Sequence, residues 1–423
     1  MNVGIIIGRY GGVDGVALET EKWVHVMQRM GHHAYILSGE YEGQERPGPT
    51  RDLVPLLAFS SSQCQWEQKH AFLGGVASES EVLESIQVAG SKIASAIEAW
   101  VTHRSIDLLL PENACALPYH LSMGVGIKLA VKRLGLPVVT HDHDFAWERG
   151  RRYVSPHPGV NQLVKQTFPL VMPGVGHAVI NSASAETLLR KHQVSSIVVP
   201  NVMDFQQSYG QKDVSNAGMS DALGLTAVDI PLFQVTRVVR RKGLETAVEL
   251  VHRLRDLPTK LVVTGTPEDD DSGYFEELTR QIRSLGLEHR VLFAGDRIGN
   301  RPDPARGMPW GLSDAYAHAA ACTFFSTYEG FGNAFVECVL ARKPIFVNNY
   351  RPVYWPDIGS KGFKTVQLED GSLTDDAVEK VRSILTNRQL AREIGEHNFG
   401  LGRRHFSYEV LQDKLETLLT QGR

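Results

Sequence analysis

Apolar residues along this chain fall into two series of short, continuous runs. Such runs are typical of strands that are buried on both faces of a parallel sheet. Between the first two runs, Trp23, Met27 and Met30 recur at helical spacing. The alternation of strand, helix and strand predicts a doubly wound α/β domain. The predicted strands of the first series are residues 3–7, 34–37, 106–110, 136–140, 178–180 and 197–199.

A polar, glycine-containing stretch at residues 206–226 separates the two series, and we interpret it as a linker. We predict an N-terminal Rossmann-like domain of residues 1–205 and a C-terminal Rossmann-like domain of residues 206–404. Ligands of such domains bind at the carboxyl ends of the strands. The second series has predicted strands at 232–236, 260–264, 291–294, 321–326 and 345–348, and predicted helices at 244–254, 274–285, 374–385, 388–399 and 408–419.

The composition is that of a globular chain with more than one domain. Its 423 residues exceed what one hydrophobic core usually holds, and 42% of them are hydrophobic. The 44 basic and 48 acidic residues leave a net charge of −4, so no global basic field attracts nucleic acid. We therefore expect small-molecule partners and no nucleic acid, and the sequence leaves assembly into a homo-oligomer open.

Membrane and secretory signals are weak in this sequence. No apolar run approaches the roughly 20 residues that span a bilayer, so we expect no membrane insertion. The N-terminal apolar run ends at Arg9 and is too short for a signal peptide. The four cysteines form no Cys-x-x-Cys pair, which argues against a metal site and favours free thiols. These features predict a cytoplasmic protein.

The segment from Tyr328 to Glu337 has the strongest chemical signal. A predicted strand runs into a glycine-rich turn, and a helix is predicted to begin near Asn333. The glycines let backbone amides approach a ligand, and the start of a helix favours a phosphate. Glu329 and Glu337 could accept hydrogen bonds from hydroxyl groups of a sugar or ribose. The alternative is a glycine-rich turn with two surface glutamates.

A basic segment directly follows the first strand of the second domain. Arg237 and Lys242 stand at the carboxyl end of that strand, where they can reach a diphosphate. The alternative is a basic loop exposed to solvent. We interpret Arg240 and Arg241 in this second way, as surface residues.

Together these two segments resemble the retaining glycosyltransferases of family 4. The shared pattern is Arg-x4-Lys-Gly after the first strand of the C-terminal domain, followed by Glu-x7-Glu opening with Glu-Gly-Phe-Gly. Gly11 and Gly12 resemble the N-terminal glycine loop of that family, and His143 resembles the histidine that contacts the donor sugar. Residues 200–202 resemble the run before the interdomain linker. The resemblance covers nearly the whole chain.

The resemblance implies the GT-B fold, in which two Rossmann-like domains face each other across a cleft. The N-terminal domain would bind the acceptor, and the C-terminal domain would bind the nucleotide sugar. A C-terminal helix at about 405–423 would cross back to the N-terminal domain. Transfer would retain the anomeric configuration without a committed enzyme nucleophile, because the leaving phosphate takes the acceptor's proton.

The resemblance also implies roles for individual residues. The catalytic residues would be His143, Arg237, Lys242 and Glu329. Arg237 and Lys242 would stabilise the negative charge of the departing diphosphate. The residues implied in donor binding are Gly11, Gly12, Arg237, Lys242, Glu329, Gly330, Phe331, Gly332, Asn333 and Glu337.

The segment 140–153 follows a strand of the N-terminal domain and is rich in charged side chains. Arg149, Arg151 and Arg152 could bind an anionic acceptor, because guanidinium groups pair with carboxylates and phosphates. A charged helix end is the alternative. Asp142 is a further candidate for acceptor binding. Glu112 and Asn113 follow the strand 106–110 and would either line the acceptor cleft or form a capping turn.

Two metal interpretations compete in the same segment. His141-x-His143 could bind zinc, but no third or fourth ligand follows at a useful spacing. Asp142-x-Asp144 is short enough to recur by chance, and residues 269–271 are interpreted as a charged loop. We expect no metal and no other cofactor besides the nucleotide sugar as co-substrate.

Several segments resemble enzymes of the mannosylglucosylglycerate synthase type. They are His-Asp-His-Asp-Phe-x-Trp-Glu-Arg at 141–149, Asp14-Gly15-Val16 with Glu19, and residues 348–357. This resemblance implies mannose transfer from GDP-mannose to glucosylglycerate, which is anionic. A sucrose-phosphate synthase-type transfer from UDP-glucose to a sugar phosphate is the alternative, although the expected N-terminal glutamine is missing. Thr236 also stands where we expect a glycine.

Three other classes of function stay open at this point. A nucleotide-sugar epimerase would share the fold. A dinucleotide-dependent oxidoreductase is disfavoured because the first glycine loop lacks Gly-x-Gly-x-x-Gly. A catalytically silent sugar-binding protein is disfavoured by the intact basic and acidic pairs at 237/242 and 329/337.

Overall fold

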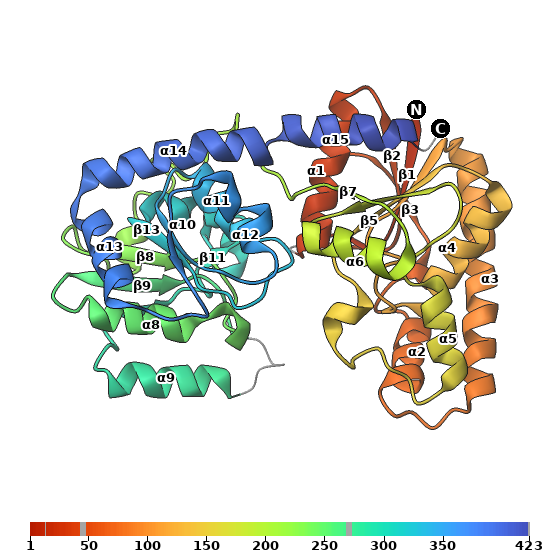
Figure 1. The fold of residues 1–423 in the computed structure, drawn as a ribbon, viewed down its shortest axis with the longest axis horizontal. Coiled ribbons are helices and arrows are strands. Elements are labelled where there is room, and N and C mark those ends of the chain that lie inside the picture. Colours follow the sequence, from red (N-terminus) through yellow and green to blue (C-terminus); the bar gives the residue numbers. More distant parts are fainter. Residues whose placement is uncertain (13, 43–47, 268–272, 422–423) are drawn as a thin grey trace. The chain divides into compact units, whose positions relative to one another are not determined.

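The computed structural model describes residues 1–12, 14–42, 48–267 and 273–421. It divides into two compact units (Figure 1). The first unit contains Met1–Val202 together with Tyr408–Arg423, and the second contains Met203–Ser407. The first boundary therefore lies three residues before position 205, where the sequence pattern suggested it.

The first unit is built on a seven-stranded parallel sheet with the strand order β3-β2-β1-β4-β5-β6-β7. The order reverses between β1 and β4, and their carboxyl ends therefore flank a switch point, where ligands of such sheets bind. The strands are β1 (Asn2–Gly11), β2 (His33–Glu42), β3 (Thr50–Leu53), β4 (Leu108–Pro111), β5 (Val138–Asp142), β6 (Val175–Val179) and β7 (Ile197–Val198).

Both faces of this sheet are buried, as the continuous apolar runs predict. Successive residues of a strand point to opposite faces. Ile5 and Ile7 of β1 accordingly pack into one core cluster with Trp23, whereas Ile6 packs into another with Ile97. The helices of this unit are α1 (Gly15–Arg29), α2 (Ser62–Phe72), α3 (Glu79–Arg104), α4 (Leu121–Leu134), α5 (Pro158–Thr167), α6 (Ser182–His192) and α15 (Tyr408–Gln421).

The last helix of the chain, α15, completes the core of the first unit. Leu411, Leu415 and Leu418 are buried in the cluster that contains Trp23 of α1. Figure 1 shows α15 beside α1, although almost 380 residues of chain separate them. Burial of such leucines typically contributes about 1.5–3 kcal/mol each, so this helix is an integral part of the unit.

The longest helix, α3, was not predicted from the sequence pattern. Ser78 and Glu81 form a capping box at its start, and its buried residues include Ile86, Ile93 and Ile97. These three side chains recur at seven- and four-residue steps, but serine, alanine and glutamate between them dilute the apolar stripe.

The second unit is built on a six-stranded parallel sheet with the order β10-β9-β8-β13-β14-β15. Its switch point lies between β8 and β13. The strands are β8 (Ile230–Gln234), β9 (Thr259–Val263), β10 (Val291–Phe293), β13 (Ala321–Phe324), β14 (Ile345–Asn348) and β15 (Val366–Leu368), and a separate pair comprises β11 (Ile298–Gly299) and β12 (Trp310–Gly311).

Helices surround this second sheet, and its main core cluster lies between the strands and α8, α9 and α13. The helices are α7 (Met219–Ala222), α8 (Leu244–Arg253), α9 (Tyr274–Ser284), α10 (Leu312–His318), α11 (Asn333–Leu340), α12 (Tyr354–Asp357), α13 (Asp375–Thr386) and α14 (Arg388–Phe406).

Residues 206–226 are not a linker, contrary to the sequence interpretation. The amide of Gly210 donates to Ser313 Oγ at 3.0 Å, and Asn216 Nδ2 donates to Asp314 Oδ1 at 3.0 Å. Met219 is fully buried. These polar side chains satisfy buried backbone and helix-end groups of the second unit, which is why the segment lacks an apolar period.

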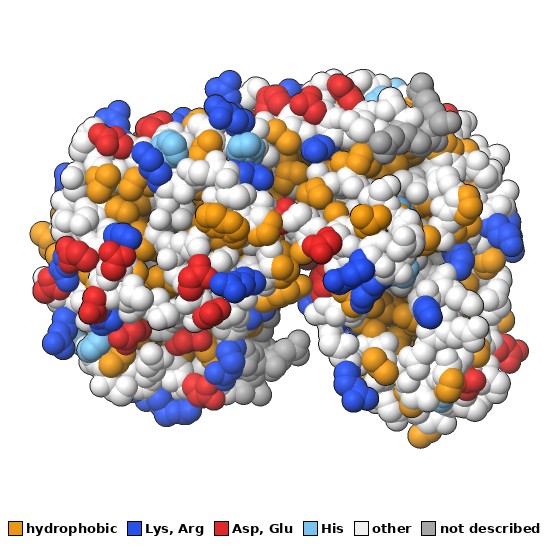
Figure 2. Space-filling view, in the orientation of Figure 1, with side chains coloured by type: hydrophobic (Ala, Val, Ile, Leu, Met, Phe, Trp, Pro, Cys, Tyr) orange, Lys and Arg blue, Asp and Glu red, His pale blue; other side chains and the backbone are white. Residues whose placement is uncertain are grey.

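On the face seen in Figure 2, basic and acidic side chains of the second unit are interspersed. Ion pairs at the surface of the second unit include Arg240 with Glu277 at 2.7 Å and Arg351 with Glu369 at 2.8 Å. Exposed pairs of this kind typically contribute less than about 1 kcal/mol each to stability.

Candidate functional site

Two basic side chains and one carboxylate meet at the switch point of the second sheet. Lys242 follows β8, and Glu329 follows β13, which pairs with β8. Lys242 Nζ donates to Glu329 Oε1 at 2.5 Å, and Arg241 donates to Glu329 Oε2 at 3.1 Å. Two segments that are 87 residues apart in the sequence are thereby joined by charge-assisted hydrogen bonds.

The electrostatics of this cluster favour a bound anion. Burial lowers the pKa of Lys242, and the charges of Arg241 and Arg237 lower it further, while Glu329 raises it. Burial alone would raise the pKa of Glu329, but Lys242 and Arg241 hold it below its usual value. The single negative charge of Glu329 therefore stands against the positive charges of Lys242, Arg241 and Arg237. The excess positive charge remains available for a negatively charged ligand.

Side chains of the central strands fix the backbone at Lys242 by hydrogen bonds. Gln234, the last residue of β8, donates from Nε2 to the carbonyl of Lys242 at 2.7 Å. Thr323 of β13 in turn donates to Gln234 Oε1 at 2.9 Å. The lysine thus stands on a short 3₁₀ turn, Arg240–Lys242, that is hydrogen-bonded to the two central strands.

Gly243 ends this turn in a conformation that suits only glycine. Its φ is +61°, and a Cβ atom there would lie 2.2 Å from the carbonyl oxygen of Phe325. We expect Gly243→Ala to lower the free energy of unfolding by about 2 to 4 kcal/mol. This loss is the sum of two costs, the left-handed backbone conformation of an alanine and the overlap of its Cβ atom with the carbonyl oxygen of Phe325. Urea unfolding measures this change.

Gly307 provides the matched control for that substitution. Its φ is +77°, but a Cβ atom there would meet nothing within 4 Å. Gly307→Ala should therefore cost only about 1 kcal/mol, the conformational part. Equal losses in the two variants would contradict the proposed steric role of Gly243.

Helix α11 begins at Asn333, as predicted, directly after the glycine-rich turn. Tyr350 donates from its hydroxyl to the carbonyl of Phe331 at 2.7 Å, which fixes the turn. Glu337, one turn into the helix, accepts a hydrogen bond from Tyr316 at 3.0 Å. The N-cap residue Gly332 makes no side-chain capping bond, so the start of α11 is a chemically suitable place for a phosphate.

The structure corrects the interpretation of the basic loop. Arg240 is half exposed and pairs with Glu277, in agreement with a surface role. Arg241 is instead part of the cluster around Glu329, and it also donates to the carbonyl of Tyr328. The 3₁₀ turn directs neighbouring arginines to different sides, and the sequence alone does not show which one faces inwards. Arg237 is exposed, and its role at the diphosphate stays a prediction.

A second cluster lies at the carboxyl ends of β4 and β5 in the first unit. Glu112 Oε1 lies 2.8 Å from His143 Nε2 and 2.9 Å from His141 Nδ1. All three side chains are buried, and the ring of Trp23 stacks on His141 at 4.0 Å between centroids. Burial would lower the pKa of His143, but Glu112 raises it, and the two imidazoles hold the pKa of Glu112 at about 2.

This cluster corrects the statement that His141 and His143 have no third ligand partner. Glu112 supplies a carboxylate oxygen, and one ligand atom from each residue lies within 4.8 Å of the others. The sequence interpretation placed Glu112 in the acceptor cleft or a capping turn. It missed the cluster because only the pairing of Glu112 with His141 between adjacent strands brings the groups together.

The predicted acceptor residues Asn113 and Asp142 hydrogen-bond to neighbouring groups at the ends of β4 and β5. Asn113 Nδ2 donates to Asp144 Oδ1 at 3.2 Å, and Asn113 Oδ1 accepts from the amide of His143 at 3.0 Å. Asp142 is 1% exposed and accepts a hydrogen bond from Thr140 at 2.8 Å. The roles of Asn113 and Asp142 in acceptor binding stay predictions.

The three arginines after β5 have different surroundings. Arg149 pairs with Asp144, and Arg151 is exposed. Arg152 donates to Gln68 Oε1 at 2.7 Å, and its guanidinium lies 5.0 Å from the ring centroid of Tyr153. Arg149 and Arg152 therefore have separate partners, and the role of the three guanidinium groups in binding an acceptor stays a prediction.

The N-terminal glycines Gly11 and Gly12 pack closely against the end of β2. Cβ atoms on them would lie 2.2 Å from the carbonyl oxygen and 2.3 Å from a side-chain oxygen of Glu42. The backbone contact at Gly11 and the positive φ angles of both residues favour glycines without a ligand, and donor binding by them stays a prediction. Residue 13 of the same loop lies outside the described residues, as do residues 269–271. Glu19 is buried and accepts a hydrogen bond from the amide of Val202 at 3.1 Å.

Comparison with known proteins identifies the class of this site. A family model described as "Glycosyl transferases group 1" matches residues 225–399, which include Lys242, Glu329 and Glu337. The mannosylglucosylglycerate synthase of Thermotoga maritima is 30% identical over 98% of this chain and 99% of its own length. The chain belongs to the glycosyltransferase family. The mannosylglucosylglycerate synthase of Petrotoga mobilis is 28% identical over 87% of this chain and 86% of its own length.

Solved structures place this glycosyltransferase in the GT-B fold. Anabaena Alr3699/HepE, solved in complex with UDP and glucose, matches with a TM-score of 0.68 at 14% identity, with 99% of each chain covered. Sucrose-phosphate synthase from Thermosynechococcus elongatus matches with a TM-score of 0.64 at 16% identity, covering 99% of this chain and 98% of its own. At these identities the likeness shows the fold alone, and it confirms the GT-B prediction.

Other features of the glycosyltransferase are structural. Tyr354 is buried and its hydroxyl lies 3.1 Å from Thr365 Oγ1, whereas Trp355 is 54% exposed. The four cysteines are free and buried. Among the described residues, no helix combines the length and apolar character needed to cross a membrane.

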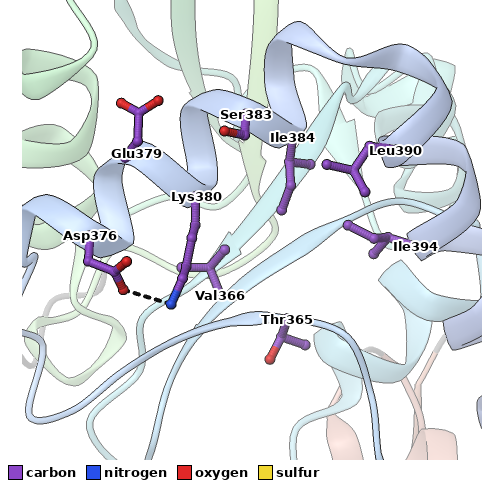
Figure 3. Close-up of a pocket in the computed structure, with 9 residues that line it drawn as sticks. All are labelled: Thr365, Val366, Asp376, Glu379, Lys380, Ser383, Ile384, Leu390 and Ile394. Atoms are coloured by element: carbon purple, nitrogen blue, oxygen red, sulfur yellow. Dashed lines mark ion pairs between the residues drawn. The ribbon is translucent and has the colours of Figure 1, made fainter.

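A cavity of about 300 Å³ between α13, α14 and β15 lies apart from the candidate donor residues (Figure 3). Its cation Lys380 is neutralised by Asp376 at 2.6 Å, and Val366, Ile384 and Leu390 give it aliphatic walls. None of the residues predicted to bind the donor lines this cavity, so it has no part in the candidate site.

Proposed function

We propose that this glycosyltransferase moves mannose from GDP-mannose to glucosylglycerate with retention of the anomeric configuration. The observation that carries the proposal is the similarity to the mannosylglucosylglycerate synthase of Thermotoga maritima, which extends over both units. The family model covers only residues 225–399. The similarity to the Thermotoga maritima enzyme also includes the first unit, so it supports a proposal about the whole chain.

The cluster at the second switch point supports the proposed chemistry. Breaking the donor's glycosidic bond leaves negative charge on the diphosphate. Lys242, Arg241 and the start of α11 are preorganised groups that can stabilise such charge. Diphosphate binding would compete with Glu329 for Lys242, which would release this carboxylate to accept hydrogen bonds from the donor sugar.

In the proposed reaction, the acceptor hydroxyl attacks the anomeric carbon as the bond to the diphosphate breaks. The leaving diphosphate oxygen takes the proton of that hydroxyl, so the new glycosidic bond forms on the same face. His143 is proposed to contact the donor sugar, and Glu112 would fix its ring. No metal takes part in this proposal. A reducing compartment, the cytoplasm, is proposed because all four cysteines are free.

A nucleotide screen is the first test of the proposal. A ligand at about 100 times its Kd adds about 2.7 kcal/mol to the stability of the folded state, which a thermal-shift assay detects. We expect GDP to stabilise the protein and UDP, ADP and NAD to leave it unchanged. Stabilisation by UDP alone would overturn GDP-mannose and favour UDP-glucose with a sugar phosphate, and stabilisation by NAD alone would overturn nucleotide-sugar transfer.

The transfer assay then tests the reaction itself. GDP-mannose and glucosylglycerate should give an α-mannosylated product by NMR, and the rate should survive treatment with EDTA. Release of GDP should require the acceptor. Conversion of the donor sugar without any acceptor would instead favour an epimerase, and an inverted product would contradict retention.

A further inference from the structure

A cavity of about 440 Å³ in the first unit has basic and aromatic walls. It lies between the 3₁₀ turn after β5 (Ala146–Arg149) and the carboxyl-terminal ends of α5 and α6. Its cationic side chains are Lys165, Lys191 and His192, and no acidic residue lines it. Its aromatic side chains are Trp147, Tyr153 and Phe168.

The two lysines of this cavity lack an anionic partner in the part of the chain that the structure describes. Among the described residues, no ion pair or hydrogen bond joins the side chain of Lys165 or Lys191 to a carboxylate. Lys191 Nζ instead lies 4.7 Å from the ring centroid of Trp147. Basic residues are common in the last turn of a helix, but here two helices bring theirs to the same cavity.

Trp147 forms a rigid wall for this cavity. Its ring stacks on the buried Phe145 with centroids 4.4 Å apart and an interplanar angle of 6°. The ring of His192 lies 5.8 Å from Trp147. An indole that is fixed in this way offers a flat apolar surface to a sugar ring, and the neighbouring cations offer pairing to a carboxylate.

Two of the three arginines predicted to hold the acceptor's anionic group already have polar partners. Arg149 is paired with Asp144, and Arg152 donates to Gln68. The lysine cavity adjoins the same segment, since Gly150 and Tyr153 line it.

We propose that the cavity bounded by Trp147, Lys165, Lys191 and His192 is the binding site for the anionic end of the acceptor. The site would take an anionic sugar, with its carboxylate between the two lysines and its ring against the indole. This inference rests on the proposed function for the identity of the acceptor. The cavity's affinity for an anionic sugar, however, can be measured without turnover.

His192 adds a dependence on pH to this site. Burial lowers its pKa, and the positive charges of Lys191 and His177 lower it further. A bound carboxylate would raise that pKa, so binding takes up a proton. The affinity for the anionic sugar should therefore increase as the pH falls below about 6.5, the ordinary pKa of histidine.

The test compares two ligands that differ in charge. Glucosylglycerate carries a carboxylate, and glucosylglycerol lacks it. We expect Lys165→Gln with Lys191→Gln to raise the Kd for glucosylglycerate at least tenfold in calorimetry, while the Kd for glucosylglycerol stays the same. In the transfer assay, the KM for glucosylglycerate should rise while the affinity for GDP is unchanged.

Lys132→Gln is the matched control, because Lys132 is an exposed lysine of α4 in the same unit and does not line the cavity. The control should bind glucosylglycerate as the wild type does. Unchanged binding by the double variant would overturn the site. Tight, lysine-dependent binding of glucose 6-phosphate with none of glucosylglycerate would support the anion site and overturn the proposed acceptor.

Discussion

Replacing Lys242 with alanine is expected to lower kcat by about 10²- to 10³-fold, the effect of removing one preorganised group that stabilises a developing anion. The side chain of Lys242 is only 12% exposed and is held against Glu329 at 2.5 Å by a turn anchored to the central strands. Water that fills the space left by Lys242→Ala would be neither charged nor held in place, so it could not stabilise the developing anion as the fixed ammonium does. Steady-state kinetics with GDP-mannose and the acceptor measure the change.

The pH profile supplies a second readout for Lys242. Only the protonated ammonium stabilises the diphosphate, and burial lowers its pKa from the usual value. The kcat/KM value, which reports the free enzyme, should therefore fall on the alkaline side earlier than an ordinary lysine would allow. Lys242→Arg should remove this alkaline decline, because a guanidinium stays charged.

Arg240→Ala is the control for the loss of a positive charge in the same turn. Arg240 points to the surface and pairs with Glu277, so this variant should keep a kcat close to that of the wild type. If Lys242→Ala also retained its turnover, the assignment of the diphosphate to the second switch point would be wrong.

Replacing Glu112 with glutamine is expected to lower the free energy of unfolding by about 3 kcal/mol at pH 5.5, because it leaves two buried imidazoles without their carboxylate. The pKa of Glu112 is held at about 2, below the ordinary value of 4.5. The contribution of Glu112 to the free energy of unfolding is therefore fully present above pH 4.5 and is lost as the pH falls towards 2.

The pKa of His143 moves in the opposite direction, since Glu112 raises it. The contribution of His143 to the free energy of unfolding is fully present below its pKa in the unfolded state, about 6.5. It is lost as the pH rises through the raised pKa of the folded state. The difference in stability between the wild type and Glu112→Gln should consequently be larger at pH 5.5 than at pH 8.5. Urea unfolding at the two pH values measures it.

Glu98→Gln removes a carboxylate from a surface pair and serves as the control. Glu98 accepts from Arg133 at 3.0 Å, and both side chains are partly exposed. This variant should lose less than about 1 kcal/mol at either pH. A similar loss in Glu112→Gln would show that the buried cluster contributes no more than a surface pair.

The sequence pattern predicted the elements that carry the donor cluster. The apolar runs that became β8 and β13 are short and bounded by charged or glycine-rich segments, so the positions of Lys242 and Glu329 after them followed directly. The meeting of these two side chains also follows from the topology, because β8 and β13 are neighbours across the switch point.

Other parts of the site depend on details that periodicity does not encode. The cluster of Glu112 with His141 and His143 requires β4 and β5 to be adjacent and in a particular register. The inward direction of Arg241 depends on a single 3₁₀ turn. The lysine cavity is assembled from the ends of two helices, α5 and α6, and both were absent from the predicted elements.

The position of α15 has a consequence for the order in which the protein folds during its synthesis. The helix supplies Leu411, Leu415 and Leu418 to the core of the first unit, yet it is translated after the whole of the second unit. The second unit, Met203–Ser407, is continuous in the sequence and can close its core without waiting for a later segment of the chain. The amino-terminal sheet must wait, with the apolar face around Trp23 uncovered, until α15 has left the ribosome.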